Sequence, residues 1–315
     1  MNKKIPLIAV IGPTASGKTG LAVAIAKKFG GEVVSADSMQ IYSELTIGTA
    51  KPTEKEMCGI LHHLVGFKSI DDEYSVANYV EDAKKAIEDI YNRGKIPVLC
   101  GGTGLYVDSL LSNTEFAEIK SDPNVRKKLF DFAEENGNEA LFEKLKQIDP
   151  VSASKTHANN LLRVVRALEV FEVTGKTMSE HQKDSHPLPS IYEVCYIGTT
   201  FEDRDKLYAR IEERIGEMLE EGVEEEAKFL FEHNGTCTAA QAIGYKEFYP
   251  YFRGEMSREE AIALLKKETR HYAKRQLTWF RRNQNINWLC RDGFSKKEEL
   301  YKAAFDIIEN FLEKK

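Results

Sequence analysis

Short apolar runs alternate with amphipathic stretches along the first third of the chain. The runs at residues 7–11, 32–36 and 96–100 have the length and composition of buried strands. Residues 18–29 and 75–93 instead repeat apolar positions at helical spacing. Strands that alternate with helices in this way predict an α/β fold, in which helices cover both faces of a parallel sheet.

The pattern changes to helices alone from residue 118 to residue 190. A helix starts at Asp122-Pro123, with Val125, Leu129 and Phe132 on one face, and a second amphipathic helix at 161–173 ends at Gly175. We therefore expect an all-helical domain at 118–190, inserted between the two parts of the core, residues 1–117 and 191–315.

The strand pattern returns after this insertion. Residues 192–199 read as a strand, and residues 203–233 as a helical stretch that is interrupted at Gly222. The last helix is expected at 295–314. The core sheet is thus predicted to resume beyond the helical domain.

A phosphate-binding motif lies between the first strand and the first helix. Residues 12–19 read GPTASGKT and match G-x-x-x-x-G-K-[ST]. In such a loop the backbone N–H groups, the helix N-terminus and the lysine hold phosphates, and the last hydroxyl binds Mg²⁺, here that of Thr19. The motif predicts a P-loop NTPase-like fold and these phosphate-binding residues: Gly12, Pro13, Thr14, Ala15, Ser16, Gly17, Lys18 and Thr19.

Composition narrows the class of protein. The 315 residues are 42 % hydrophobic, and no apolar run is long enough to span a membrane. No leader pattern is visible at the N-terminus, so we expect a cytoplasmic protein, with a monomer as the default. The five cysteines are tens of residues apart, which indicates neither a disulfide framework nor a zinc site, and we expect them to be buried: Cys58, Cys100, Cys195, Cys237 and Cys290.

Charge is unevenly distributed, although the net charge is −6. Residues 266–282 carry seven basic residues against Glu268, interleaved with aromatic side chains, whereas residues 212–226 carry eight glutamates against Arg214. An acidic protein with one basic helix at 266–282 is typical of docking to nucleic acid. A basic helix side that is merely solvated is the alternative.

Three loops are expected to meet at the carboxyl ends of the strands: residues 12–19, Asp37 and residues 101–104. The strand at 96–100 ends in Cys-Gly-Gly, without the acid that a P-loop ATPase uses to hold Mg²⁺. Asp37 is the nearest candidate. It is either a general base that faces the acceptor substrate or, with Ser38, a helix cap.

Two further pairs of residues each allow two interpretations. Arg210 and Arg214 share a helix face and could bind a diphosphate, or they could pair with Glu213 or Glu217. The pair at residues 62–63, both histidines, has no second cluster of ligands, which favours a structural role over a metal site.

Seven segments together resemble one family, the tRNA dimethylallyltransferases, also called isopentenyl transferases. Besides the phosphate loop they are DSMQIY (37–42), IGTAKP (47–52), GGTGLY (101–106), RALEV (166–170), QAIGYK (241–246) and KRQLTW (274–279). The resemblance covers nearly the whole chain. Eukaryotic relatives carry a C-terminal zinc finger that is not found here, so the chain looks like the bacterial form.

The resemblance implies transfer of a dimethylallyl group from dimethylallyl diphosphate to the exocyclic amine of the adenosine 3′ of the tRNA anticodon. The loop then holds the diphosphate together with Arg214, and Mg²⁺ on Thr19. Asp37 is the implied base, Thr103 lies near the flipped adenine, and Thr19 and Arg214 complete the catalytic set. The implied contacts with the anticodon stem-loop, the basic helix included, are Asp37, Ser38, Met39, Gln40, Thr103, Arg126, Arg163, Arg166, Gln241, Ala242, Ile243, Gly244, Tyr245, Lys246, Lys274 and Arg275.

Two rival functions share these features. A small-molecule kinase would use ATP on the same loop and the same Asp37. A non-catalytic RNA-binding protein would keep the loop only as a remnant.

Overall fold

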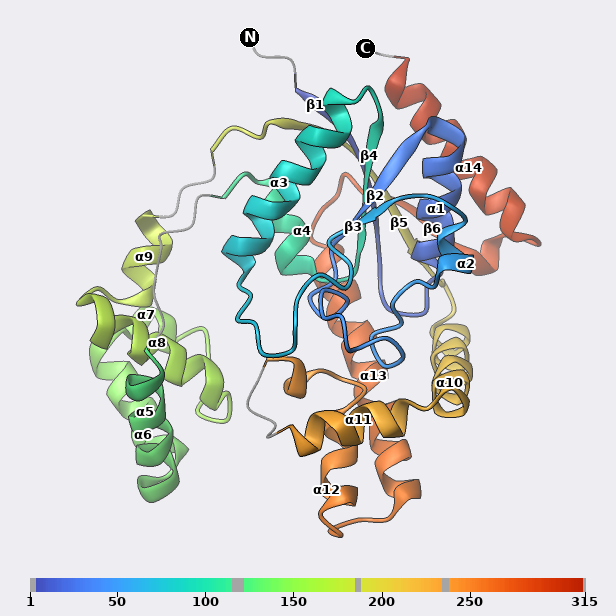
Figure 1. The fold of residues 1–315 in the computed structure, drawn as a ribbon. Coiled ribbons are helices and arrows are strands. Elements are labelled where there is room, and N and C mark those ends of the chain that lie inside the picture. The colour runs from blue at the N-terminus through green and yellow to red at the C-terminus, as the bar shows by residue number, and fades with distance from the viewer. Residues whose placement is uncertain (1–3, 115–121, 185–187, 234–237, 314–315) are drawn as a thin grey trace. The chain divides into compact units, whose positions relative to one another are not determined.

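The computed structural model describes residues 4–114, 122–184, 188–233 and 238–313 (Figure 1). The chain forms two compact units, one of Met1–Leu111 with Ser190–Lys315 and one of Ser112–Pro189. We call them the core unit and the helical unit. The predicted boundary between residues 117 and 118 lies outside the described residues, and the chain returns to the core unit at Ser190.

Within the described residues the core unit holds a parallel sheet of six strands in the order β3-β2-β4-β1-β5-β6 (Figure 1). Their bounds are Ile5–Ile11 (β1), Gly31–Ser35 (β2), His62–His63 (β3), Ile96–Gly101 (β4), Tyr192–Thr200 (β5) and Asn287–Cys290 (β6). This confirms the predicted fold class. The strands β3 and β6 were not expected, because two and four residues at the sheet edges are too short to show a period.

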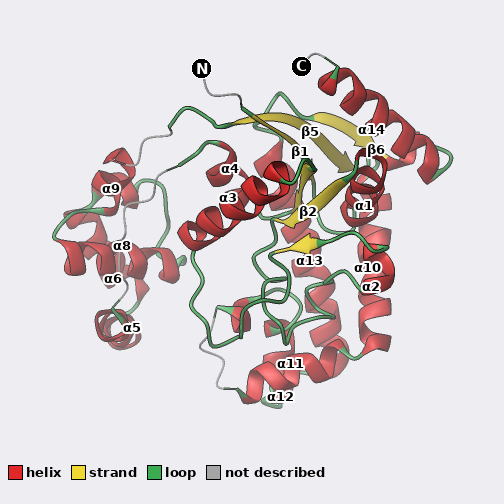
Figure 2. Cartoon of the chain, turned by 45° about the horizontal axis from the view of Figure 1, so that its top comes forward, coloured by secondary structure: helices red, strands yellow, loops and turns green. Residues whose placement is uncertain are grey.

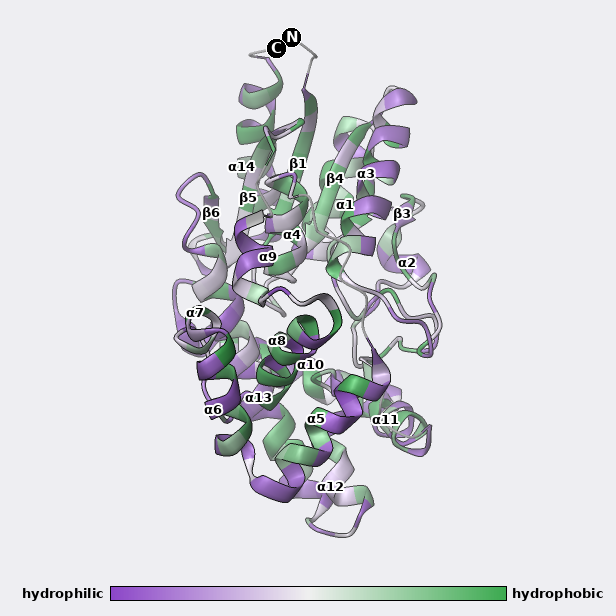
Figure 3. Ribbon diagram, turned by 90° about the vertical axis from the view of Figure 1, so that its left-hand side faces the viewer, coloured by the Kyte–Doolittle hydropathy of each residue, from purple (hydrophilic) through white to green (hydrophobic). Residues whose placement is uncertain are grey.

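Helices cover both faces of the sheet (Figure 2). On one face lie α1 (Lys18–Phe29) and α14 (Lys297–Leu312), whose apolar sides pack on strand residues such as Ile8 and Val98. On the other lie α3 (Val76–Asn92) and α4 (Gly104–Leu111). Figure 3 shows the central strands β1 and β4 as hydrophobic, whereas hydrophilic and hydrophobic bands alternate along the covering helices. The helix predicted at 18–29 has these bounds in the structure.

Local sequence accounts for α3. Ser75 begins the helix, since its hydroxyl accepts the N–H of Asn78 while the Asn78 side chain accepts the N–H of Ser75. Tyr79, Ala83 and Ile87 then follow at intervals of four residues and are fully buried. The helix therefore packs along one apolar stripe.

In Figure 1 the remaining elements of the core unit lie below the carboxyl ends of the strands or along the edges of the sheet. They are α2 (Glu54–Met57), α10 (Arg204–Glu221), α11 (Val223–Glu232), α12 (Tyr249–Phe252) and α13 (Arg258–Phe280), with 3₁₀ turns at Ala239–Gln241, Lys246–Phe248 and Arg291–Gly293. Gly222 separates α10 from α11, as predicted. The predicted basic helix at 266–282 is corrected: it is the second half of α13, and Arg281 and Arg282 follow the last helical residue.

The helical unit has its own core. Its helices are α5 (Pro123–Asn136), α6 (Asn138–Ile148), α7 (Pro150–Ala153), α8 (Leu161–Thr174) and α9 (Met178–Asp184). Asp122 caps α5, and Gly175 ends α8, as the sequence indicates. Val125, Leu129 and Phe132 pack in the same apolar cluster.

None of the helices in the described part of the chain combines the length and the apolar composition that crossing a membrane requires. Cysteine burial differs from the expectation. Cys195 is buried, but Cys100 and Cys290 are half-buried and Cys58 is exposed, and all four are free thiols. Cys237 lies outside the described residues.

Candidate active site

The phosphate loop joins β1 to α1 and is held against the end of β5. Gly12 has φ +148°, and a Cβ at this position would lie 2.2 Å from the carbonyl oxygen of Thr199. Only glycine lets the backbone pass this close to the strand. The hydroxyls of Ser16 and Thr199 lie 2.8 Å apart in a buried hydrogen bond, which ties the other end of the loop to the same strand residue.

Within the loop, Thr14, Ala15, Lys18 and Thr19 line a cavity, whereas Gly12, Pro13, Ser16 and Gly17 shape the backbone behind it. Lys18 Nζ donates to the Pro13 carbonyl oxygen at 2.6 Å, so the ammonium group is folded back over the loop. Burial lowers the pKa of Lys18 to about 8, and the charge of Arg214 adds to this effect against the opposing influence of Asp37. A bound anion would raise the pKa of this lysine again, because it favours the charged form.

Asp37 follows β2 and lines the same cavity. Its Oδ1 accepts the N–H of Met39 at 2.9 Å and that of Gln40 at 3.4 Å, which caps a turn rather than a helix. Among the residues that the structure describes, nothing donates to Oδ2. One carboxylate oxygen thus has the capping role, and the other is available to a substrate.

Thr103 connects the loop after β4 to the end of β2. Its N–H donates to the Ala36 carbonyl oxygen at 3.1 Å, and its hydroxyl oxygen accepts the N–H of Ser38 at 3.1 Å. Gly101 and Gly102, which precede it, line the cavity. Thr103 therefore fixes the position of Ser38 beside Asp37.

Gln276, on α13, joins two of the three loops, and sequence reasoning missed it. Its Oε1 accepts the N–H of Thr14 at 2.8 Å, and its Nε2 donates to the Gly102 carbonyl oxygen at 2.9 Å. The side chain is buried and lines the cavity. The residue lies inside the KRQLTW segment, but its partners are 262 and 174 residues away, and no local pattern reports them.

The two arginines of α10, Arg210 and Arg214, lie in different environments. Arg214 lines the cavity, and burial, with the like charge of Arg210, lowers its pKa. Arg210 Nη1 lies 2.6 Å from Glu213 and 3.3 Å from Glu217. Arg210 therefore pairs with glutamates, which was one of the alternatives, whereas Arg214 faces the cavity, and its contact with a diphosphate stays a prediction.

The cavity lies within the core unit and has a volume of about 420 Å³. Its charged lining comes from Lys18 of the phosphate loop, Asp37, Arg214, Lys246 and Arg275. Apolar side chains from α10, α13 and the 238–246 segment also face it, namely Ile211, Ile215, Met218, Ala242, Ile243 and Leu265. Such a lining suits a ligand with a charged end and a hydrocarbon end.

Most of the expected tRNA contacts of the core unit face this cavity: Ser38, Met39, Gln40, Gln241, Ala242, Ile243, Gly244, Lys246 and Arg275. The structure corrects the expectation that the Tyr245 side chain contacts tRNA. Its side chain is 0 % exposed, because the ring packs under Gly48 and its hydroxyl donates to Glu226 at 2.8 Å. Its buried side chain is therefore not exposed to RNA.

A second, open hollow of about 550 Å³ lies on α13 and just beyond its end. We call it the basic surface, and it is lined by His271, Lys274, Arg275, Thr278, Trp279 and Arg282. The Arg282 guanidinium lies 4.0 Å from the Trp279 ring centre, and Asp108 accepts the indole N–H at 2.8 Å. Arg275 borders both this surface and the cavity.

In the helical unit the three predicted arginines differ. Arg126 and Arg166 both pair with Glu169, at 3.1 and 2.9 Å, and that carboxylate is fully buried. Their charges compensate a buried acid, and their contact with tRNA stays a prediction. Arg163 is exposed on the same helix, α8.

The histidines of β3 are bonded within the protein. His62 Nδ1 lies 2.9 Å from the Ile60 carbonyl oxygen, and His63 Nε2 lies 2.7 Å from Glu32. No group of three or more His, Cys, Asp or Glu side chains is placed to hold a metal ion in the described part of the chain. These bonds agree with the structural interpretation.

Comparison with known proteins relates this geometry to one family. The IPP transferase family matches residues 40–283. A tRNA dimethylallyltransferase of Acetivibrio thermocellus is 49 % identical over 307 residues, which are 97 % of this chain and 98 % of that relative. A second relative with this description, from Thermoanaerobacter pseudethanolicus, is 46 % identical over 98 % of this chain and 99 % of its own length.

Solved structures agree. The crystal structure of the full-length tRNA isopentenylpyrophosphate transferase of Bacillus halodurans is 42 % identical, has a TM-score of 0.71, and matches over 98 % of each chain. A eukaryotic dimethylallyltransferase, solved acting on tRNA, is 30 % identical with a TM-score of 0.76, over 97 % of this chain and 80 % of that one. The chain belongs to the IPP transferase family, with the tRNA dimethylallyltransferases.

Proposed function

We propose that this protein transfers a dimethylallyl group from dimethylallyl diphosphate to tRNA and releases diphosphate. The observation that supports this most directly is a single cavity that unites the phosphate loop, Arg214 and the accessible oxygen of Asp37 with an apolar lining. The relatives described above are named for this reaction. A group donor, an acceptor and a base can meet in such a space.

The donor is expected to bind with its diphosphate on the loop. The amides of the loop, Lys18 and Arg214 supply positive charge where the leaving group forms, which stabilises the transition state for breaking the allylic C–O bond. Ile215, Met218 and Leu265 offer an apolar surface for the hydrocarbon end and keep water away from it.

Mg²⁺ fits the residues present. Thr19 lines the cavity next to Lys18, and Mg²⁺ in phosphate sites takes few protein ligands and keeps several waters. When bound, the ion would neutralise charge on the departing diphosphate. Thr19 would hold it together with the diphosphate oxygens.

The acceptor is expected to be the exocyclic amine of the adenosine 3′ of the anticodon. Its lone pair is delocalised into the ring, so removal of a proton as the new C–N bond forms assists the reaction. Asp37, which lines the cavity and uses Oδ1 for its turn, is the base proposed for that role. A stacked base cannot enter the cavity, and we infer that it is flipped out. Arg275 borders both the cavity and the basic surface, where phosphates of the stem-loop would dock.

A direct test supplies labelled dimethylallyl diphosphate or labelled ATP to the protein with unmodified tRNA. We expect label in tRNA from the prenyl donor alone, and a mass gain of one prenyl unit on adenosine after digestion to nucleosides. Label that enters tRNA from ATP alone would contradict the proposed prenyl transfer. Tight tRNA binding with no transfer from either donor would support the non-catalytic RNA-binding protein.

A further inference from the structure

The carboxylate of Glu226, on α11, is surrounded by hydrogen-bond donors from two segments that are distant in the sequence. Oε1 accepts the N–H of Thr46 at 2.5 Å, and Oε2 accepts the N–H of Gly48 at 2.9 Å. The N–H of Ile47 lies 3.2 and 3.1 Å from the two oxygens. Successive N–H groups that converge on one point form an anion-binding nest, and here the anion belongs to the protein itself.

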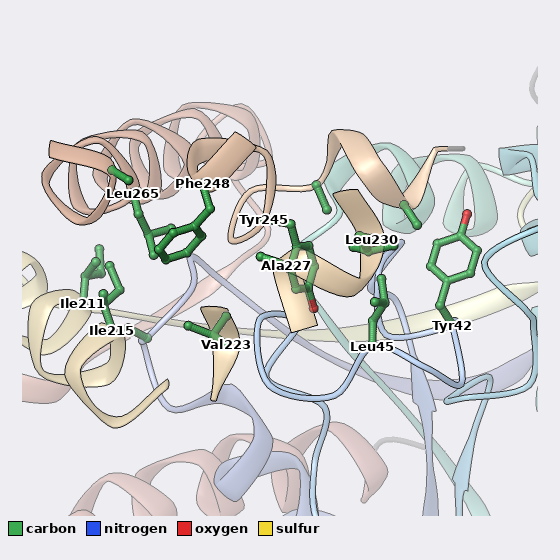
Figure 4. Close-up of a cluster of buried hydrophobic side chains, with 14 of the residues drawn as sticks. Tyr42, Leu45, Ile211, Ile215, Val223, Ala227, Leu230, Tyr245, Phe248 and Leu265 are labelled. Carbon is green, nitrogen blue, oxygen red and sulfur yellow. The ribbon is translucent and has the colours of Figure 1, made fainter. Parts of the chain in front are cut away.

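The second segment reaches the same carboxylate through Tyr245. Its hydroxyl donates to Glu226 Oε2 at 2.8 Å, and Figure 4 shows its ring beside Ala227 with the hydroxyl directed toward the loop of residues 45–50. Burial, with the negative charge of Glu226, raises the pKa of Tyr245, so that its hydroxyl remains a donor. One carboxylate therefore binds donors from both segments.

The two segments also touch directly. A Cβ at Gly48 would lie 2.6 Å from the Tyr245 ring, and a Cβ at Gly244 would lie 3.3 Å from the Gly48 carbonyl oxygen. A side chain at position 48 would require the Tyr245 ring to move. The two segments are therefore packed directly against each other.

Both segments line the cavity, with Gly48 and Thr49 from the first and Ala242, Ile243 and Gly244 from the second. Glu226 itself does not line it. We propose that Glu226 is a positioning residue for prenyl transfer, which fixes the cavity wall formed by these two segments through the nest and Tyr245. The inference rests on the proposed function for its kinetic part.

The chemistry calls for a carboxylate at this position. Every group around Glu226 that bonds to it donates: three N–H groups and the hydroxyls of Thr46 and Tyr245. Glutamine has the same shape, but its NH₂ group would face donors at one of the two oxygen positions. The substitution Glu226→Gln thus replaces one of the two acceptor oxygens by a donor, with little change in volume.

The experiment compares Glu226→Gln with Glu225→Gln, a neighbouring glutamate of the same helix that is exposed. In Glu226→Gln we expect faster amide hydrogen exchange in peptides covering both 45–50 and 238–247. We also expect a loss of kcat/KM for tRNA prenylation of at least about tenfold, since partly buried donors of both segments lose a carboxylate oxygen that accepted from them. The pH profile should keep its shape, because Glu226 exchanges no proton with substrate. Glu225→Gln should match the wild type.

Unchanged exchange in either segment, or faster exchange with unchanged kcat/KM, would overturn the inference. Should Glu226→Gln fail to fold, Tyr245→Phe is the deciding variant, because it keeps the ring under Gly48 and removes only the hydrogen bond to Glu226. We expect a two- to fivefold loss of kcat/KM in this variant. Wild-type kinetics would overturn the inference. If the wild-type protein transfers no prenyl group, the proposed function is wrong. The amide hydrogen exchange of the two segments does not depend on that result and still tests the structural role of Glu226.

Discussion

The backbone N–H of Thr14 donates to the side-chain oxygen of Gln276 at 2.8 Å, so a residue of α13 holds the phosphate loop. The amide nitrogen of the same side chain donates to Gly102 at 2.9 Å. The distance between the two loops is therefore set by one buried glutamine. The helix that carries it also carries the basic surface, so both parts of the proposed site depend on α13.

We expect Gln276→Glu to lower kcat/KM for dimethylallyl diphosphate by about 10- to 100-fold, because a buried group left without its partner costs about 1–3 kcal/mol. The carboxylate would still accept from Thr14 but would face the Gly102 carbonyl oxygen without a proton to donate. Steady-state kinetics with tRNA at saturation measure the effect. Gln284→Glu, at an exposed position, is the matched control. Equal kinetics for both variants would mean that the loops keep their spacing without Gln276.

Asp37→Asn separates the two roles of this residue. The amide oxygen can still accept from Met39 and Gln40, so the turn and the melting temperature should be preserved. Loss of the general base should lower kcat by about 10²- to 10⁴-fold while the Kd for tRNA changes little. Rapid-quench single-turnover assays measure the chemical step directly. Asp37→Ala serves as the comparison, because it removes the cap as well and should also lower the melting temperature.

The lowered pKa of Lys18 gives the binding of the donor a pH dependence. In the free protein Lys18 loses its proton as the pH rises through about 8, whereas a bound diphosphate favours the charged lysine. Affinity should therefore be highest below pH 8 and fall above it, by up to about tenfold per pH unit, until the pKa of the bound state is reached. Calorimetric titration with a non-reactive diphosphate analogue measures this. Lys18→Arg stays charged throughout, and the fall should be absent; a fall that persists would assign it to another group.

The sequence predicts those parts of the molecule whose causes are local. The phosphate loop and α1 follow from a motif and a helical period, and Gly222 and Gly175 end helices as expected. The clamp at Gln276 and the nest around Glu226 join residues 174 to 262 positions apart, and hydrogen bonds of this kind leave no periodic pattern. The remaining differences between the predicted and observed site residues depend on which side chains are buried.

Arg210 and Arg214 illustrate this point. Both arginines lie on one face of α10. Arg210 pairs with a glutamate, whereas Arg214 faces the cavity that α13 and the phosphate loop also line. Tyr245 is similar, because its place under Gly48 is visible only in three dimensions. Residue type and spacing predicted the chemistry, but not which side chain faces the ligand.

The basic surface should contribute to tRNA binding mainly through phosphates. Lys274→Ala with Arg275→Ala should weaken binding and reduce the slope of log K against log salt by about 1.5, since each lost phosphate contact changes the slope by about 0.7–0.9. Filter binding at several salt concentrations measures the slope. Lys296→Ala with Lys297→Ala makes the same change of charge at exposed positions near the start of α14 and should keep the wild-type slope. Identical slopes for the two double variants would assign the basic surface a structural role.

The arginines of α8 allow stability and RNA binding to be separated within the helical unit. Arg166→Ala leaves the buried Glu169 with Arg126 as its remaining arginine partner, and we expect a loss of about 1–3 kcal/mol in the free energy of unfolding. Arg163→Ala, at an exposed position, should change that free energy by less than about 0.5 kcal/mol. Urea denaturation of the full chain measures both. If Arg163 contacts tRNA, its variant should weaken binding at unchanged stability. A loss of stability in Arg163→Ala as large as that in Arg166→Ala would contradict this division, because it would show that exposure on α8 does not separate the two roles.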